Sequence, residues 1–97
     1  MATVIYGDFE WHDDKATENL AKHGVSFEEG STVFADLDYL LEPDATEPAR
    51  FVALGFSGVA RLLFVVHIER GERIRIISAR RATRTEAQAY ERRRSPE

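Results

Sequence analysis

The fold of this chain is decided by residues 50–79, RFVALGFSGVARLLFVVHIERGERIRIISA. Three runs within this stretch are rich in β-branched, aliphatic and aromatic residues: 50–56, 61–69 and 73–79. The links between the runs, 57–60 and 70–72, are too short to contain a crossover helix. Consecutive runs therefore pair as antiparallel neighbours, and the stretch predicts a three-stranded meander.

Upstream of the meander, the sequence predicts one strand followed by a helix. Residues 3–11 are rich in β-forming residues and predict the first strand. Asp13 or Asp14 can cap a helix that runs to about His23, and Gly24 supplies the stop at its C-terminal end.

A second short helix and a short strand complete the first half of the chain. Ser26-Phe27-Glu28-Glu29 is a capping box, which opens a helix carrying Phe27, Val33 and Phe34. Residues 39–41 predict a strand, and residues 42–49, which contain two prolines, predict a loop.

Downstream of the meander, Thr83-Arg84-Thr85-Glu86 is another capping box, and it opens a helix that continues to about Arg94. Ser95-Pro96 ends that helix. The order β-α-α-β-β-β-β-α predicts an α+β fold, an antiparallel sheet with two N-terminal helices and one C-terminal helix. We expect residues 1–97 to form a single domain.

Composition excludes several classes of protein. The chain has no cysteine, which excludes disulfides and thiol catalysis. The longest aliphatic and aromatic run, Leu62–Val66, is far too short to span a membrane. The N-terminus lacks the basic start and apolar stretch of a signal peptide, so we expect a cytoplasmic protein.

The two halves of the chain carry opposite charge. Residues 1–49 hold two lysines and twelve acids, so 2 − 12 = −10, and residues 50–97 hold eleven arginines and five glutamates, so 11 − 5 = +6. Arginine binds phosphates and carboxylates through two parallel hydrogen bonds, which favours a phosphate-bearing or acidic partner. The alternative is that the two halves pair with each other in the folded monomer.

Strand alternation predicts a cationic face on the meander. If Arg70-Gly71 is a two-residue turn, then Arg61, His67, Ser78 and Arg80 lie on one face of the sheet. That face combines a titratable imidazole with two guanidinium groups, which is a workable phosphate site. The alternative for His67 is a half-buried strand histidine with its hydrogen bonds satisfied. A register shift of one residue would reverse every side chain.

More basic residues meet at the start of the C-terminal helix. Arg80, Arg81 and Arg84 lie where the last strand passes into that helix, whose free N–H groups favour anions. These arginines predict phosphate binding, and ion pairing with the acidic half is the alternative.

The first predicted helix carries a polar stripe. Lys15, Asn19 and Lys22 share one helical face, which is suited either to RNA phosphates or simply to solvent. His23, just before Gly24, is either a C-terminal cap or a general acid or base. His12, Asp13 and Asp14 cluster without matching ligands elsewhere, so we predict no metal site and no cofactor.

Three segments together resemble the BrnT family, the toxin half of type II toxin–antitoxin pairs. They are Phe9-Glu10-Trp11, the block Asn19-Leu20-Ala21-Lys22-His23-Gly24-Val25-Ser26-Phe27-Glu28-Glu29, and the block Arg73-Ile74-Arg75-Ile76-Ile77-Ser78-Ala79-Arg80-Arg81-Ala82-Thr83. The resemblance spans nearly the whole chain in the expected order. It implies a fold similar to the RelE-type ribonuclease toxins.

The resemblance also implies a metal-independent endoribonuclease that halts translation. Its partner would be a BrnA-like antitoxin, a small DNA-binding protein that covers the toxin and represses the shared operon, so that operator DNA is contacted only through the antitoxin. A dimer of toxin–antitoxin heterodimers is the plausible assembly. By position, the resemblance selects Lys22 and His23 in the first block and Arg80, Arg81 and Arg84 near the second, with Lys15 and Asn19 at matching helical positions.

Our mechanistic hypothesis is attack of the RNA 2′-hydroxyl on the adjacent phosphodiester. His23 or His67 would transfer the protons, and Arg80 and Arg84 would hold the scissile phosphate. Lys15, Asn19, Lys22, Arg61 and Arg81 would contact the rest of the RNA. The competing hypothesis is a catalytically inactive subunit whose basic face only binds an acidic partner.

Overall fold

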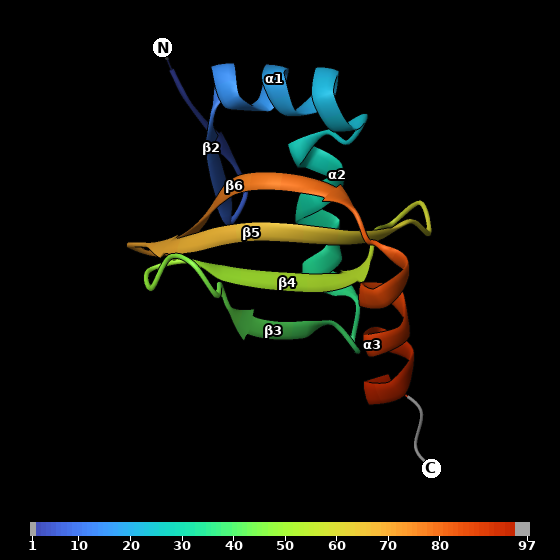
Figure 1. Ribbon diagram of the computed structural model, residues 1–97. Helices are drawn as coiled ribbons and strands as arrows, with labels where there is room; N and C mark the ends of the chain where they lie inside the picture. The colour runs from blue at the N-terminus through green and yellow to red at the C-terminus, as the bar shows by residue number, and fades with distance from the viewer. Residues whose placement is uncertain (1, 95–97) are drawn as a thin grey trace.

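The predicted meander is the centre of the molecule. In the computed structural model, which describes residues 2–94, it consists of β4 (Phe51–Phe56), β5 (Leu62–Arg70) and β6 (Arg73–Arg81), each antiparallel to the next (Figure 1). The complete sheet has the order β1-β2-β6-β5-β4-β3. The pairing of β2 with β6 is parallel, and the other pairings are antiparallel.

The N-terminal segment forms a hairpin, so the prediction of one strand over residues 3–11 is wrong. β1 (Thr3–Tyr6) pairs with β2 (Phe9–His12) across a turn at Gly7 and Asp8. Gly7 has a φ of +60°, a conformation that glycine adopts without steric cost and that tight hairpin turns require.

The first helix ends as predicted but is not capped as predicted. α1 (Asp13–His23) ends at Gly24, whose left-handed backbone lets its N–H donate to the Leu20 carbonyl. The N-cap position belongs to His12, which makes no side-chain cap hydrogen bond. Asp13 and Asp14 lie instead in the first turn, where the helix dipole favours negative charge.

The capping box at Ser26 opens α2 (Phe27–Ser31), as predicted. The Ser26 hydroxyl accepts a 3.0 Å hydrogen bond from the Glu29 N–H. The segment then continues as the 3-10 helix η1 (Thr32–Ala35). A Cβ atom at Gly30 would lie 3.2 Å from the Ala79 Cβ, so glycine at this position lets α2 pack closely against β6.

The sheet's other edge and the last helix complete the fold. β3 (Leu40–Pro43) pairs with β4, so the predicted loop over residues 42–49 is wrong for its first two residues. Pro43 is tolerated because an edge strand needs no donor on its free side. α3 (Arg84–Arg94) begins at the predicted capping box, and the expected stop at Ser95-Pro96 lies outside the described residues.

Helices cover one face of the sheet more completely than the other. α2 packs behind β6, η1 continues behind β4, and α1 lies beyond β6, as Figure 1 shows. The core between these helices and the sheet is made of the buried residues Trp11, Val25, Phe27, Val33, Ala53, Leu63, Val65, Ile76 and Ala79. α3 borders the opposite face, anchored by Tyr90, whose hydroxyl donates a 2.6 Å hydrogen bond to Asp36 Oδ2. Most of that second face is therefore open, and we call it the open face.

Among residues 2–94, no helix is long and apolar enough to cross a membrane.

Candidate nucleic-acid interface

A β-bulge decides which side chains reach the open face. The hairpin turn is Gly71-Glu72 rather than Arg70-Gly71, because Arg70 pairs with Arg73. The register then shifts between Val66 and His67, so that Ile77 of β6 is left without a partner in β5. An extra residue reverses the alternation of side chains beyond it. The predicted common face of Arg61, His67, Ser78 and Arg80 is therefore wrong.

His67 points into the core, on the face covered by helices. His67 is 3% exposed. Its ring centroid lies 4.9 Å from the ring centroid of Phe34 and 6.2 Å from that of Phe51. Its Nδ1 atom lies 3.3 Å from the Val65 carbonyl oxygen. Burial lowers the pKa of His67, because a charged imidazolium would lose its hydration there. The alternative stated above, a strand histidine with its hydrogen bonds satisfied, describes His67 better than the predicted catalytic role in proton transfer.

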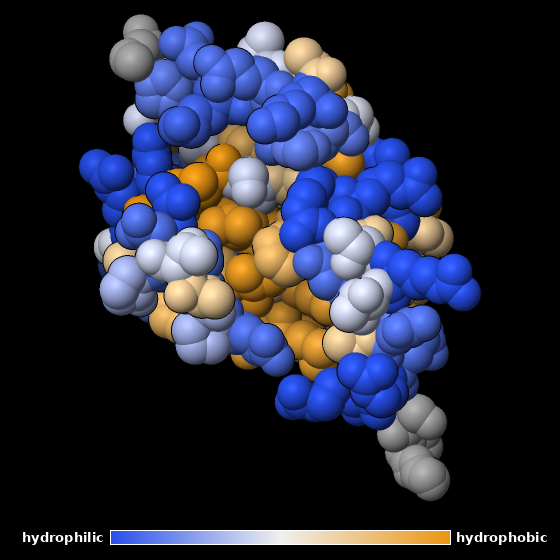
Figure 2. All heavy atoms as spheres, viewed as in Figure 1, coloured by the Kyte–Doolittle hydropathy of each residue, from blue (hydrophilic) through white to orange (hydrophobic). Residues whose placement is uncertain are grey.

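Beyond the bulge, Ser78 and Arg80 lie on the open face. Directly paired residues share a face, and the pairing gives two rows across four strands. These rows are Leu40–Leu54–Phe64–Arg80 and Glu42–Val52–Val66–Ser78. Figure 2 shows the result, apolar side chains gathered in the middle of this face and hydrophilic ones around them.

Arg80 is held in a fixed position on this face. Its Nη1 and Nη2 atoms each donate a 2.9 Å hydrogen bond to the Glu86 carboxylate, and Nη1 also donates to the Arg81 carbonyl at 3.1 Å. The guanidinium carbon lies 3.9 Å from the centroid of the Phe64 ring, a cation–π contact. Three of the five N–H groups of Arg80 are used, and within residues 2–94 the structure gives no partner for Nε–H or the second Nη2–H.

The basic residues of α1 meet β6 at the edge of the open face. Lys15, Lys22 and His23 line a shallow pocket of about 240 Å³ together with Glu18, Asn19, Ile77 and Ser78. Lys15 and Lys22 are exposed, and His23 is half-buried. Ser78 and Arg80 are two residues apart on the same face, a separation of about 7 Å along a strand. Ser78 therefore lines this pocket and is also the neighbour of Arg80 on the open face.

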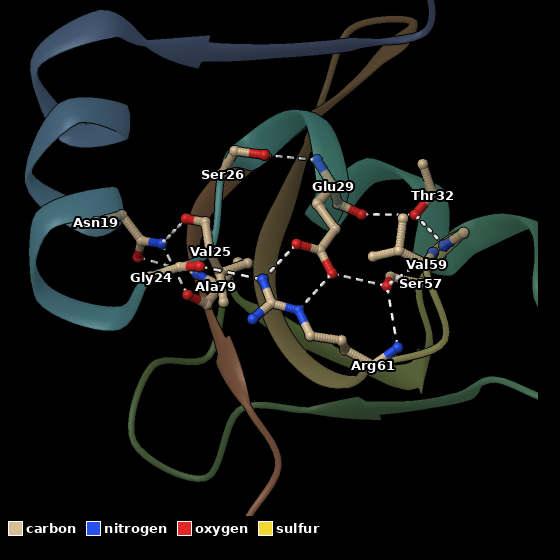
Figure 3. A network of polar contacts seen from close by, with 11 residues as sticks. Asn19, Gly24, Val25, Ser26, Glu29, Thr32, Ser57, Val59, Arg61 and Ala79 are labelled. Atoms are coloured by element: carbon tan, nitrogen blue, oxygen red, sulfur yellow. Dashed lines mark hydrogen bonds and ion pairs between the residues drawn. The ribbon is translucent and has the colours of Figure 1, made fainter.

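Asn19 has a structural role in the fold, and its contact with RNA stays a prediction. It is 6% exposed, and its amide nitrogen donates to the carbonyls of Ala79 at 2.7 Å and Val25 at 2.9 Å. Its amide oxygen accepts from the Ala79 N–H at 3.1 Å. Since β2 pairs only with residues 74 and 75 of β6, Asn19 supplies the pairing that Ala79 lacks from a strand (Figure 3). All of its hydrogen-bonding groups point inward.

Arg61 is also committed to the fold. Its guanidinium pairs with Glu29, with Nε donating to Oε2 at 2.9 Å, and Nη2 donates to the Gly24 carbonyl at 3.0 Å. The Ser57 hydroxyl donates to the same Glu29 carboxylate at 2.7 Å (Figure 3). The hydrogen bond from Arg61 is the largest cause of the lowered pKa of Glu29. Arg61 thus ties the turn between β4 and β5 to the start of α2, and whether it also contacts RNA stays a prediction.

The three arginines at the junction of β6 and α3 diverge. Arg81 pairs with Leu63 and so shares the helix-covered face, whereas Arg80 lies on the open face. Arg81 is exposed at the end of its strand, and Arg84 is exposed in the first turn of α3. The guanidinium groups of Arg80 and Arg81 therefore start from opposite faces of the sheet. Whether Arg81 and Arg84 contact RNA stays a prediction.

The opposite charges of the two halves do pair within the monomer. Five ion pairs among residues 2–94 join an arginine of the second half to an acid of the first. The most buried of them links Arg75 to Glu10 at 2.7 Å. Part of the charge split is thus used within the folded monomer.

Sequence reasoning missed Phe64 and Glu86. Glu86 is recognisable from the sequence only as a helix cap, and Phe64 reaches Arg80 only because of the bulge. Among the described residues, His12, Asp13 and Asp14 place their ligand atoms within 4.8 Å of one another. Asp13 Oδ1 already accepts a 3.2 Å hydrogen bond from the Ala2 N–H. That these three residues bind no metal stays a prediction.

Comparison with known proteins gives a family and a fold. A family model described as the ribonuclease toxin BrnT of type II toxin–antitoxin systems matches residues 11–86. Among solved structures, the chain is similar to the ribonuclease toxin BrnT of Brucella abortus, with 26% sequence identity and a TM-score of 0.62. That match covers 76% of this chain and 94% of the other. No curated protein matches the chain. The predicted family and the α+β fold class are confirmed.

Proposed function

This chain belongs to the BrnT family of ribonuclease toxins, and from that premise we propose that it cleaves RNA on the open face without a metal ion. The observation that carries the proposal is the environment of Arg80. Its guanidinium is held by three hydrogen bonds and a cation–π contact, yet it retains Nε–H and one Nη2–H, the pair of donors that binds two phosphate oxygens.

The proposed reaction is attack of a 2′-hydroxyl on the adjacent phosphorus. The hydroxyl loses its proton, the new O–P bond forms, and the 5′-oxygen leaves with a proton, giving a cyclic phosphate. Arg80 stabilises the charge that builds on the phosphate oxygens in the transition state. His23 transfers the protons, because histidine is the side chain best suited to proton exchange near neutral pH and because its pocket adjoins Ser78.

The remaining cations position the RNA. Lys15 and Lys22 line the same pocket as His23 and contact the phosphates that flank the scissile bond. Arg84, exposed in the first turn of α3, extends the cationic rim on the other side of Arg80. The apolar floor formed by Val52, Leu54 and Val66 gives unstacked bases a surface on which to lie.

A toxin of this type needs an antitoxin, and we propose a BrnA-like DNA-binding protein that covers the open face in the cytoplasm. The complex is then a dimer of toxin–antitoxin heterodimers, since symmetric assembly suits a repressor of a palindromic operator. The cations of the open face are what an acidic segment of such a partner would neutralise.

One observation favours the competing function, an inactive subunit that only binds a protein. Arg61 and Arg80 are both neutralised by carboxylates in the monomer, which lowers the charge available to RNA. The experiment that separates the two functions is incubation of the purified chain with a defined RNA in EDTA and, in parallel, in Mg²⁺. Equal cleavage in both supports the proposal. Cleavage in Mg²⁺ alone overturns metal independence, and intact RNA in both favours the binding subunit.

A further inference from the structure

We propose that Glu86 is a positioning residue for RNA cleavage, because it fixes the Arg80 guanidinium in the orientation that receives the phosphate. This inference rests on the proposed function of Arg80. Glu86 itself does not touch RNA, and it acts only through Arg80.

The Glu86 carboxylate performs two tasks with its two oxygens. Oε1 accepts from the Thr83 N–H at 2.9 Å, and the Thr83 hydroxyl accepts from the Glu86 N–H at 3.2 Å, so the capping box of α3 is complete. Oε1 also accepts from Arg80 Nη1, and Oε2 accepts from Arg80 Nη2, both at 2.9 Å. The cap needs only Oε1. Oε2 is therefore devoted to Arg80.

Two further contacts restrict the Arg80 guanidinium where Glu86 does not. The Phe64 ring covers one face of the guanidinium, and the Arg81 carbonyl accepts the outer Nη1–H. The plane and the rotation of the group are thus set before any ligand binds. What remains is the edge formed by Nε–H and the second Nη2–H, which faces away from Glu86.

Fixing this edge in advance matters because arginine is a long, flexible side chain. A ligand that meets a mobile guanidinium must order it, and that cost reduces both binding and rate. The side chains of Arg80 and Glu86 are 32% and 23% exposed, so the pair is accessible to RNA yet sheltered enough to stay formed. The hydrogen bond from Arg80 is the largest cause of the lowered pKa of Glu86, so the carboxylate is charged at neutral pH.

The variant that tests this is Glu86→Gln. Glutamine keeps the capping box through its side-chain oxygen, but it offers an NH₂ group where Oε2 accepted from Arg80. We expect cleavage to fall about tenfold in kcat with little change in KM, because the geometry of the transition state is lost. In an Arg80→Ala background, Glu86→Gln should have no further effect, because the two residues act as one unit.

Thr83→Ala is the matched control. It removes the other half of the same cap and leaves the contacts between Glu86 Oε2 and Arg80 in place. We expect it to lower the melting temperature at least as much as Glu86→Gln does, and to leave the cleavage rate unchanged. A rate loss in Thr83→Ala equal to that in Glu86→Gln would mean that the cap alone matters.

A second measurement does not depend on activity. In the ¹⁵N NMR spectrum, the Arg80 Nε–H group should be as rigid as the backbone in the wild type and in Thr83→Ala, and mobile in Glu86→Gln. A rigid Arg80 in Glu86→Gln overturns the proposal. Cleavage by Glu86→Gln at the wild-type rate or faster also overturns it. A wild type with a rigid Arg80 that leaves RNA intact would instead overturn the proposed function.

Discussion

At the scale of single residues, two histidines that the sequence treats alike have different environments. His67 is buried between aromatic rings, and His23 lines a pocket open to solvent. We expect His67→Leu to cleave RNA at the wild-type rate, and His23→Ala to lose about a hundredfold in rate, a typical loss for a general acid or base. Initial rates on one RNA substrate measure both. Full activity in both variants would exclude catalysis by histidine.

His67 also makes the stability of the fold depend on pH. Its pKa is lowered in the folded chain because of burial, so the folded state favours the neutral ring. That stability is complete above the unfolded pKa of about 6.5 and decreases as the pH falls below it. Urea unfolding of the wild type at pH 7.5 and pH 5 should show this loss, and His67→Leu should not. An equal loss in the variant would assign the effect to another group.

The structural role of Asn19, which is to hydrogen-bond the backbone of Ala79 and Val25, was not predicted from the sequence. Asn19→Ala leaves the N–H and the carbonyl of Ala79 and the carbonyl of Val25 without partners in the core. We expect the free energy of unfolding to fall by about 2–4 kcal/mol, since a buried unsatisfied group costs about 1–3 kcal/mol. Urea denaturation measures it, with the exposed neighbour Glu18→Ala as control. A loss as small as that of the control would contradict the assignment.

At the scale of elements, the packing of η1 against β4 depends on a glycine. A Cβ atom at Gly55 would lie 2.8 Å from the Tyr39 Cβ and 3.1 Å from the Val33 Cγ1. Gly55→Ala should therefore push η1 away from the sheet and destabilise the fold by about 1–3 kcal/mol, the usual cost of overpacking. Gly58→Ala is the matched control, because its nearest neighbour would lie at 3.6 Å. Thermal unfolding compares the two, and equal melting temperatures would refute the close packing.

Elements with local signals could be predicted from the sequence, and those set by distant partners could not. The capping boxes at Ser26 and Thr83 and the stop at Gly24 depend on residues within one helical turn, and all three occur as expected. The bulge at Ile77 has no such signal, because isoleucine suits either face of a strand. That one residue moves Arg80 away from His67. The sequence therefore identifies Lys15, Lys22, His23 and Arg80 as candidates but not their arrangement.

At the scale of the whole molecule, ion pairs and hydrogen bonds to carboxylates make the fold sensitive to acid. The pKa of Glu29 is lowered mainly by its hydrogen bond from Arg61 and that of Glu86 mainly by its hydrogen bond from Arg80. Burial alone would raise the pKa of Asp36, but hydrogen bonds from Tyr90 and two backbone N–H groups lower it overall.

Because these carboxylates have a lower pKa in the folded state, their contribution is present above the unfolded values of about 4 and is lost as the pH falls through the folded ones. We expect stability to fall steeply below about pH 4, as a second phase after that of His67. Circular dichroism during acid titration follows it. Retention of the full fold at pH 2 would contradict the importance of these pairs.

We propose that RNA is cleaved on the open face around Arg80. The most direct test is the rate of cleavage of one defined RNA in EDTA by the wild type, Arg80→Ala and Arg73→Ala. Arg73 is an exposed arginine at the other end of β6, so its removal controls for the loss of one positive charge. We predict that Arg80→Ala loses about a hundredfold or more in rate, as when a group that stabilises the transition state is removed, and that Arg73→Ala matches the wild type. Equal rates in all three proteins, or equal losses in both variants, would mean that RNA is not cleaved around Arg80.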